Sequence, residues 1–378
     1  MLEILPQIPR YMAMRRGIGP KILPLNLVFA VTYRCNSRCK SCNIWMYTKK
    51  AHRPPAGQQW PYDASQLEAR PELSLDEFKR VFDSLGQAPF YLTFTGGEPF
   101  LREDLEEIVI AAHERCKPKV ITIPTSAMYW KTTPQRVHEI ARACQGTDVI
   151  LNISMDGIGE EHDRIRGVPR NDELALRTLE ALKQNKPDNL VIGLHTVVSS
   201  LNVHRAGEIV DHLESLGPDS VITEVAEERL EMGNRNSGIT PDPETYTKVA
   251  ADLSRKVSRR KASGFARITR AFRTEYYHLA AQALRENKQA LPCYAGVASG
   301  HVAPDGDVWA CCVRAEPIGN VRAVDYDFGR VWRGYLADKM RASIAAGECA
   351  CPMANAFYTT MLMDPKTLAK VALRAAAG

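Results

Sequence analysis

The chain has 378 residues, which is enough for one large domain together with a smaller one. With 45% hydrophobic and 25% charged residues and a net charge of +5 at pH 7, it is ordinary for a soluble globular protein and too weakly basic to indicate a nucleic-acid partner. No apolar run reaches the roughly eighteen residues of a membrane-spanning helix, and the N-terminal stretch lacks the apolar core of a signal peptide, so we expect a cytoplasmic protein without a transmembrane segment.

The first feature along the chain is a set of three cysteines on the loop after a predicted strand. Residues 1–24 form a basic lead-in, and the apolar run 25–31 predicts a buried strand. Cys35, Cys39 and Cys42, the first cysteine group, follow with the spacing C-x₃-C-x₂-C. Three thiolates can hold three irons of a 4Fe–4S cube and leave the fourth iron open for a non-protein ligand, which is typical of a catalytic site. A zinc knuckle or a chance spacing is the alternative.

Strands and helices then alternate. The segment 46–73 is long, polar and rich in proline, so it is expected to be either a lid over the substrate or disordered. Beyond it, we predict helices at 74–85, 102–116, 134–144, 173–185 and 203–216, and strands at 91–95, 120–124, 149–155, 190–198 and 220–226. Six strands separated by helices predict an α/β fold with a parallel sheet, but they are too few for a closed eightfold barrel.

Two loops at the carboxyl ends of these strands carry residues suited to binding a charged ligand. In Thr95-Gly96-Gly97-Glu98-Pro99, the glycines allow close approach of the backbone and Glu98 could bind an ammonium group, although an ordinary turn would look similar.

The second loop contains Ser154 and Asp156 after the fourth strand, with Arg166 farther along. A guanidinium suits a carboxylate ligand. The alternative for Arg166 is a surface ion pair with one of three nearby acids, Glu160, Glu161 or Asp163. Asp156 could accept hydrogen bonds from ribose hydroxyls or cap the following turn.

The C-terminal third changes character. Residues 227–290 read as a helical connector, with helices at 243–261 and 265–286. Residues 291–353 contain five cysteines and a hairpin turn at 304–307. Residues 354–378 form a tail with a predicted helix after Pro365. In a reducing compartment, clustered cysteines indicate metal binding or catalysis more than disulfides.

The first cysteine group and the Gly-Gly-Glu-Pro loop resemble the radical S-adenosylmethionine (SAM) superfamily. That resemblance implies a partial (β/α)₆ TIM-like barrel over 25–226. It also implies a 4Fe–4S cluster that chelates SAM, cleaves it reductively and yields a 5′-deoxyadenosyl radical, which abstracts a hydrogen atom from the substrate. Gly96, Gly97 and Glu98 would hold the SAM amino group, and Ser154 and Arg166 its carboxylate. Thr125-Ser126-Ala127 departs from the Thr-Asn-Gly that relatives often carry.

Residues 291–353 resemble the C-terminal extensions called SPASM and twitch. The resemblance implies a small C-terminal iron–sulfur domain with a second, auxiliary 4Fe–4S cluster, bound by a second cysteine group of Cys293, Cys311, Cys349 and Cys351. A zinc site made by the same thiolates is the alternative. Cys312 is then a spare thiol, either a hydrogen-atom donor to a product radical or a small buried residue.

The substrate is left open by these motifs. An auxiliary cluster can take an electron from a substrate radical, which favours an oxidation. Peptide modifiers of the subgroup often have an N-terminal leader-binding domain, and only the lead-in 1–24 precedes the first strand here, so we expect a small molecule such as a sugar, nucleoside or lipid precursor. A peptide-modifying maturase and a non-enzymatic iron–sulfur or zinc sensor are the alternatives. A flavodoxin or ferredoxin is the expected electron donor.

Overall fold

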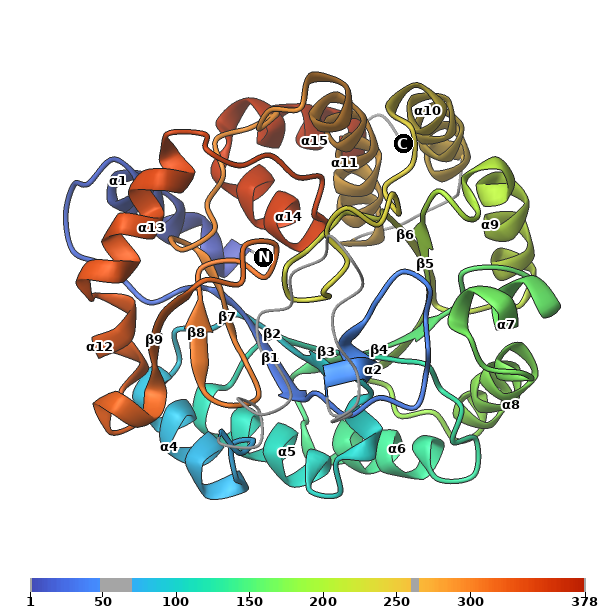
Figure 1. The fold of residues 1–378 in the computed structure, drawn as a ribbon, viewed down its shortest axis with the longest axis horizontal. Helices are drawn as coiled ribbons and strands as arrows, with labels where there is room; N and C mark the ends of the chain where they lie inside the picture. The colour runs from blue at the N-terminus through green and yellow to red at the C-terminus, as the bar shows by residue number, and fades with distance from the viewer. Residues whose placement is uncertain (1, 48–69, 260–264, 377–378) are drawn as a thin grey trace.

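A computed structural model describes residues 2–47, 70–259 and 265–376. Its core is a single sheet of nine strands in the order β6-β5-β4-β3-β2-β1-β7-β8-β9, curved into an open barrel (Figure 1). The first six strands are β1 (Asn26–Thr32), β2 (Tyr91–Gly96), β3 (Val120–Thr125), β4 (Asp148–Ser154), β5 (Leu190–Val198) and β6 (Ser220–Val225). All six were predicted from the sequence, with ends that differ by one residue at most.

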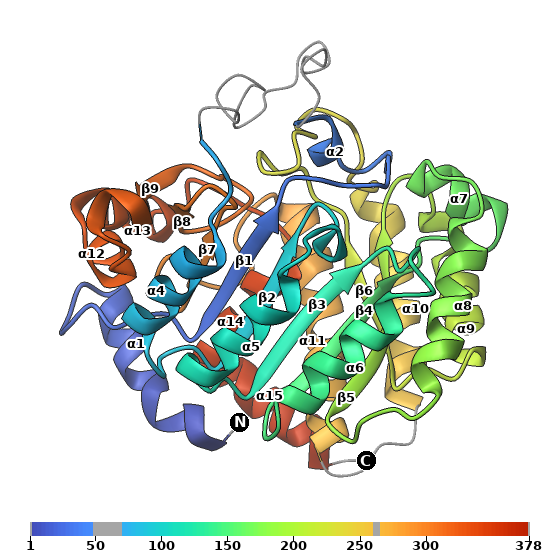
Figure 2. The same cartoon turned by 90° about the horizontal axis from the view of Figure 1, so that it is seen from below.

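Strands β1 to β6 are parallel, as the alternation with helices predicts. The helices that connect and cover them are α4 (Leu75–Leu85), α5 (Leu105–Cys116), α6 (Thr133–Ala143), α8 (Asn171–Lys183) and α9 (Ala206–Ser215). Leu151 and Ile153 of β4 are fully buried, whereas Asn152 and Ser154 are only half-buried. Because side chains alternate across a sheet, the half-buried set faces the barrel lumen. In Figure 2 the arrowheads of these strands point toward the end where α2 (Ile44–Tyr47) lies.

The C-terminal strands continue the barrel sheet. β7 (Ser299–Val302) pairs in parallel with β1, and β8 (Asp307–Trp309) and β9 (Pro317–Asn320) extend it in antiparallel fashion. The hairpin predicted at 304–307 is therefore confirmed. However, segment 291–353 does not have a sheet of its own, because its strands cover the edge of β1 that would otherwise expose unpaired backbone groups.

Helices close the side on which the sheet is open. In Figure 1, α11 (Phe265–Glu286), α14 (Ala354–Met363) and α15 (Pro365–Ala376) lie between β6 and β7. Tyr276 of α11 fixes this closure, because its hydroxyl donates to the carbonyl of Pro352 at 3.1 Å and accepts from the backbone N–H of Val225 at 3.3 Å. The predicted helices at 265–286 and after Pro365 are confirmed, and the one predicted at 243–261 is confirmed as α10 (Pro243–Arg259), with residues 260–261 outside the described residues. Helix α14 was not predicted.

The lead-in contains a helix, α1 (Ile8–Arg15), that contacts α14. The remaining elements are η1 (Leu2–Gln7), α1 (Ile8–Arg15), η2 (Pro99–Leu101), α7 (Glu160–Arg166), η3 (Val203–Arg205), α10 (Pro243–Arg259), η4 (Val321–Val324), α12 (Phe328–Trp332) and α13 (Tyr335–Ala345). Most of the predicted lid, residues 48–69, lies outside the described residues. None of the helices in the described ranges has the length and apolar character needed to cross a bilayer.

Candidate active site

The first cysteine group lies on the loop after β1, at the carboxyl end of the sheet. All three thiols are free, and their charges would interact with one another. Burial, reinforced by the neighbouring Cys39, raises the pKa of Cys35 to about 12, and burial also raises the pKa of Cys39 and Cys42. Ionising these thiols together therefore requires a positive partner, which a bound metal cluster would provide.

No group of three or more His, Cys, Asp or Glu side chains in the described part of the chain could hold a single metal ion. A 4Fe–4S cube differs from a single ion because each thiolate binds its own iron. Three free thiols on one loop, with like charges that interact, are a donor set that suits such a cube.

The Gly-Gly-Glu-Pro loop packs directly against the beginning of the cysteine loop. The N–H of Gly97 donates to the carbonyl of Thr32, and the N–H of Glu98 to that of Arg34, each at 2.8 Å. A Cβ on Gly97 would lie 2.1 Å from the Arg34 carbonyl oxygen, and one on Gly96 would lie 2.3 Å from that of Thr32. The close approach predicted from these glycines is therefore made to the cysteine loop itself.

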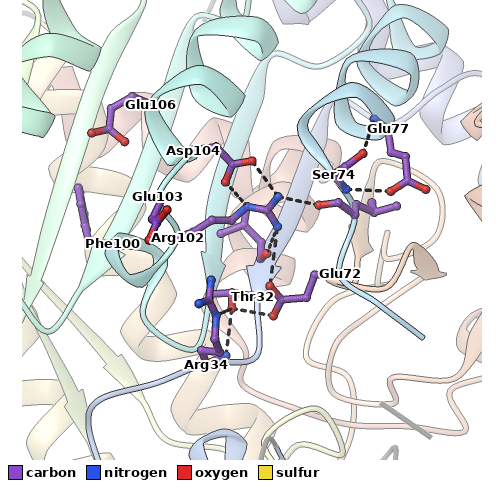
Figure 3. Close-up of polar contacts among 12 residues, drawn as sticks. Thr32, Arg34, Glu72, Ser74, Glu77, Phe100, Arg102, Glu103, Asp104 and Glu106 are labelled. Carbon is purple, nitrogen blue, oxygen red and sulfur yellow. Dashed lines mark hydrogen bonds and ion pairs between the residues drawn. The ribbon is translucent and has the colours of Figure 1, made fainter. Parts of the chain in front are cut away.

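A buried polar network fixes the last residues of β1 (Figure 3). Arg102 donates to the carbonyl of Val31 at 2.8 Å and lies 3.9 Å from the carboxylate of Glu72. Glu72 accepts hydrogen bonds from the Thr32 hydroxyl at 2.7 Å and from the backbone N–H of Tyr33 at 2.9 Å. This network could not be predicted from local sequence patterns, because it joins residues far apart along the chain.

Glu98 is 2% exposed, and its carboxylate points toward the end of β3. One oxygen accepts from the Thr125 hydroxyl at 2.8 Å and from the N–H of Phe100 at 3.2 Å. The other oxygen accepts from the N–H and the hydroxyl of Ser126 at 2.8 and 2.6 Å. Thr125 and Ser126 thus hold Glu98, and Ser126 is one of the two residues that depart from the family pattern. Its role in binding the SAM amino group stays a prediction.

Arg166 ends α7, a short helix that was not predicted, and forms a buried ion pair with Asp156. The guanidinium Nη1 is 3.0 Å from Asp156 Oδ2, and the two side chains are 13% and 4% exposed. The alternative surface ion pair with Glu160, Glu161 or Asp163 is therefore wrong. The second oxygen of Asp156 accepts from the N–H of Val197 at 2.9 Å, so both oxygens are already engaged within the protein.

The end of α7 is attached to the cysteine loop. The N–H groups of Arg38 and Lys40 donate to the carbonyls of Arg166 and Ile165 at 3.0 and 2.9 Å. Burial opposes the charge of Arg166, but Cys39 and Asp156 outweigh it and raise the pKa of Arg166 above its usual range. Within the described residues, the buried Nε of Arg166 has no hydrogen-bond partner, and such an orphaned donor on a guanidinium suits an incoming carboxylate.

The lumen beside Ser154 holds a second pair of titratable groups. Ser154 is next to His195 of β5 in the strand register, and His195 Nε2 is 3.6 Å from the carboxylate of Glu224 on β6. Burial lowers the pKa of His195, but Glu224 outweighs it and raises that pKa overall. His195 thus faces an acid across the lumen.

The second cysteine group is also brought together. The charges of Cys293, Cys311 and Cys349 would interact, and so would those of Cys351 with Cys311 and Cys293. A hydrogen bond from Cys312 lowers the pKa of Cys311 to about 7. Cys312 itself is buried, with its sulfur 3.2 Å from the sulfur of Met353. This arrangement favours Cys311 over Cys312 as the ligand.

Comparisons with known proteins agree with this geometry. The family model described as "Radical SAM superfamily" matches residues 29–213. The Fe-coproporphyrin III synthase of Methanosarcina barkeri is 28% identical over 215 residues, which cover 53% of this chain and 47% of that protein. Mycofactocin maturase MftC of Mycobacterium tuberculosis is 27% identical over 361 residues, covering 90% and 81%. The chain thus matches about half the length of the first relative and most of the second.

A similar fold is found in SuiB of Streptococcus suis, solved in complex with the precursor peptide SuiA. The two structures share a TM-score of 0.59 at 16% sequence identity, over 90% of this chain and 72% of SuiB. SuiB has also been solved bound to S-adenosylmethionine. At this identity the likeness shows the fold, and it confirms the predicted TIM-like partial barrel.

Proposed function

We propose that this chain is a radical SAM enzyme, because residues 29–213 match the family model of that name, and that its first cysteine group binds the 4Fe–4S cluster that receives SAM. When bound, the cluster and SAM supply one electron and a 5′-deoxyadenosyl radical, which abstracts a hydrogen atom from the substrate. The observation that carries the proposal is the unpartnered, buried Nε of Arg166, on a helix end hydrogen-bonded to the cysteine loop.

The residues of this chain would bind and orient the cofactor. Arg166, kept charged by Asp156, would donate from its free Nε to the SAM carboxylate, and Ser154 lies on the same lumen-facing edge. Glu98 and the backbone of Gly97, which pack against the start of the cysteine loop, would receive the SAM amino group. The buried position of these groups would keep water from the reactive centre.

The second cysteine group would bind an auxiliary 4Fe–4S cluster, which we propose as the acceptor of an electron from the substrate radical. Support comes from the mutual charge interactions of these thiols and from the lowered pKa of Cys311. A fully ligated cluster has no open iron for substrate but can still transfer electrons. The overall reaction would then be an oxidation, with a flavodoxin or ferredoxin as the proposed donor to the first cluster.

The proposed substrate is a peptide side chain. The similarity that extends over most of this chain is to a protein named a maturase and to the fold of a protein solved with a precursor peptide. A small molecule, expected from the sequence alone, is the second candidate. It is favoured by the Fe-coproporphyrin III synthase, whose similarity covers about half of the chain.

The test is SAM cleavage by anaerobically reconstituted protein with dithionite, measured as release of 5′-deoxyadenosine. The unmodified protein should release it, and a variant with Ala at all three positions of the first cysteine group should not. Cys144→Ala is the matched control, because Cys144 is fully buried at the end of α6 and belongs to neither cysteine group. Equal release from the triple variant would refute the assignment.

A further inference from the structure

A loop after β6 joins the two cysteine-bearing segments. We call residues 226–234 the strap; it crosses the mouth of the barrel beside α2 (Figure 2). On one side it is bonded to the first cysteine loop. The backbone N–H of Asn43 donates to the carbonyl of Met232, and the Asn43 side chain to that of Gly233, both at 2.8 Å. The Asn234 side chain donates to the carbonyl of Ser41, also at 2.8 Å.

On its other side the strap is bonded to the segment that carries Cys311 and Cys312. The N–H of Leu230 donates to the carbonyl of Val313 at 3.0 Å, and the N–H of Glu231 to that of Cys312 at 3.4 Å. The guanidinium Nη1 of Arg229 lies 3.7 Å from the sulfur of Cys312. Residues 229–231 therefore contact the segment that carries Cys311 and Cys312, and residues 232–234 contact the first cysteine loop.

Two side chains, the buried Asn234 and the half-buried Arg229, brace the strap. Asn234 is 2% exposed, and its Oδ1 accepts from the backbone N–H of Arg229 at 2.7 Å while its Nδ2 reaches Ser41. Arg229 is held between the carboxylates of Glu227 and Glu231, the latter at 3.7 Å. A displacement of Cys312 would therefore be passed through Arg229 and Asn234 to the loop between Cys39 and Cys42.

We propose that the strap couples the two cysteine groups, with Asn234 as the positioning residue. An intact, well-ordered second cysteine group would then increase the affinity of the first group's site for SAM. The inference rests on the proposed function, because it needs a cofactor site at each group. Its physical basis is that the hydrogen-bonded strap biases both loops toward one arrangement, and coupling between two sites in this way is reciprocal.

A double-mutant cycle tests the coupling. The cycle combines Asn234→Ala with the double replacement Cys349→Ala and Cys351→Ala, which removes two proposed ligands of the second group. The readouts are the dissociation constant of SAM for each anaerobically reconstituted protein and the hydrogen exchange of peptides covering 38–47 and 227–234. Arg235→Ala is the matched control, because within the described residues Arg235 makes no hydrogen bond or ion pair. Asn234→Ser is measured in parallel in case Asn234→Ala folds poorly.

With the strap intact, loss of the second cysteine group should weaken SAM binding roughly three- to tenfold, the effect of about one hydrogen bond. It should also speed the hydrogen exchange of peptides covering residues 38–47. In the Asn234 variants, the same loss should have no further effect on either readout. Equal effects in both backgrounds, or no effect in either, would overturn the coupling. Failure of the unmodified protein to bind SAM would instead overturn the proposed function.

Discussion

Arg166→Ala is the sharpest test of how the candidate site is built, because it removes the cation from a buried ion pair. Asp156 is 3% exposed. Without Arg166, its carboxylate would keep one hydrogen bond, from the N–H of Val197 to Oδ1, while Oδ2 would lose its partner. Removing one partner of a buried pair costs about 3–5 kcal/mol, since the other charge is left without compensation. We therefore expect the free energy of unfolding to fall by roughly that amount.

Urea unfolding of the cluster-free protein, followed by circular dichroism, measures the change. The matched control is the double variant Arg166→Ala and Asp156→Asn, in which the buried charge is gone but the shape of residue 156 is kept. The double variant should regain most of the lost stability. Its affinity for SAM should stay weakened by roughly ten- to hundredfold, because a charge-assisted hydrogen bond is worth about 1.5–3 kcal/mol.

The double variant is thus expected to recover stability without recovering its affinity for SAM. A double variant that binds SAM as tightly as the unmodified protein would show that Arg166 serves only the fold. An Arg166→Ala protein with unchanged stability would refute the reasoning from the buried ion pair.

Three further predictions concern the clusters and the lumen. Replacing the whole first cysteine group with Ala should leave about four irons and a broad visible absorption band from the second group; a colourless, zinc-containing protein would contradict this. Replacing Cys293 or Cys349 should spare SAM cleavage at saturating SAM but abolish the oxidised product, and unchanged product yield would exclude electron transfer. Glu224→Gln should lower the pKa of His195, followed by NMR. Because that pKa is raised in the folded state, the pair should stabilise the protein below the unfolded value of about 6.5 and lose this effect as pH rises through the folded pKa. A pKa of His195 that Glu224→Gln leaves unchanged would refute the pairing.

The sequence was sufficient to predict the elements of the barrel. Its strands are short apolar runs, and the helix that begins after Ser74 has a capping box that the structure contains. Such signals are local, because periodicity and capping depend on residues within one or two turns of each other. The same locality made the cysteine spacings and the Gly-Gly-Glu-Pro loop recognisable.

The contacts that assemble the site could not be predicted in this way. Helix α7 is only a turn or two long and contains closely spaced charges, so it has no strong periodic signal. Its role depends on hydrogen bonds from Arg38 and Lys40, on a loop more than a hundred residues earlier. The strap likewise has an irregular backbone, and its partners lie on two segments distant in the sequence.

Glu98 shows how a local motif and its long-range surroundings together create a candidate binding group. Its carboxylate accepts four hydrogen bonds, all from neutral donors, and within the described residues no cation forms an ion pair with it, whereas Asp156 has Arg166. A buried carboxylate without a counter-charge is costly even when it is hydrogen-bonded. Of the four donors, the hydroxyls of Thr125 and Ser126 can rotate away, so an ammonium group could take a donor's place and also supply the missing charge. The position that departs from the family pattern is thus compatible with a cationic ligand.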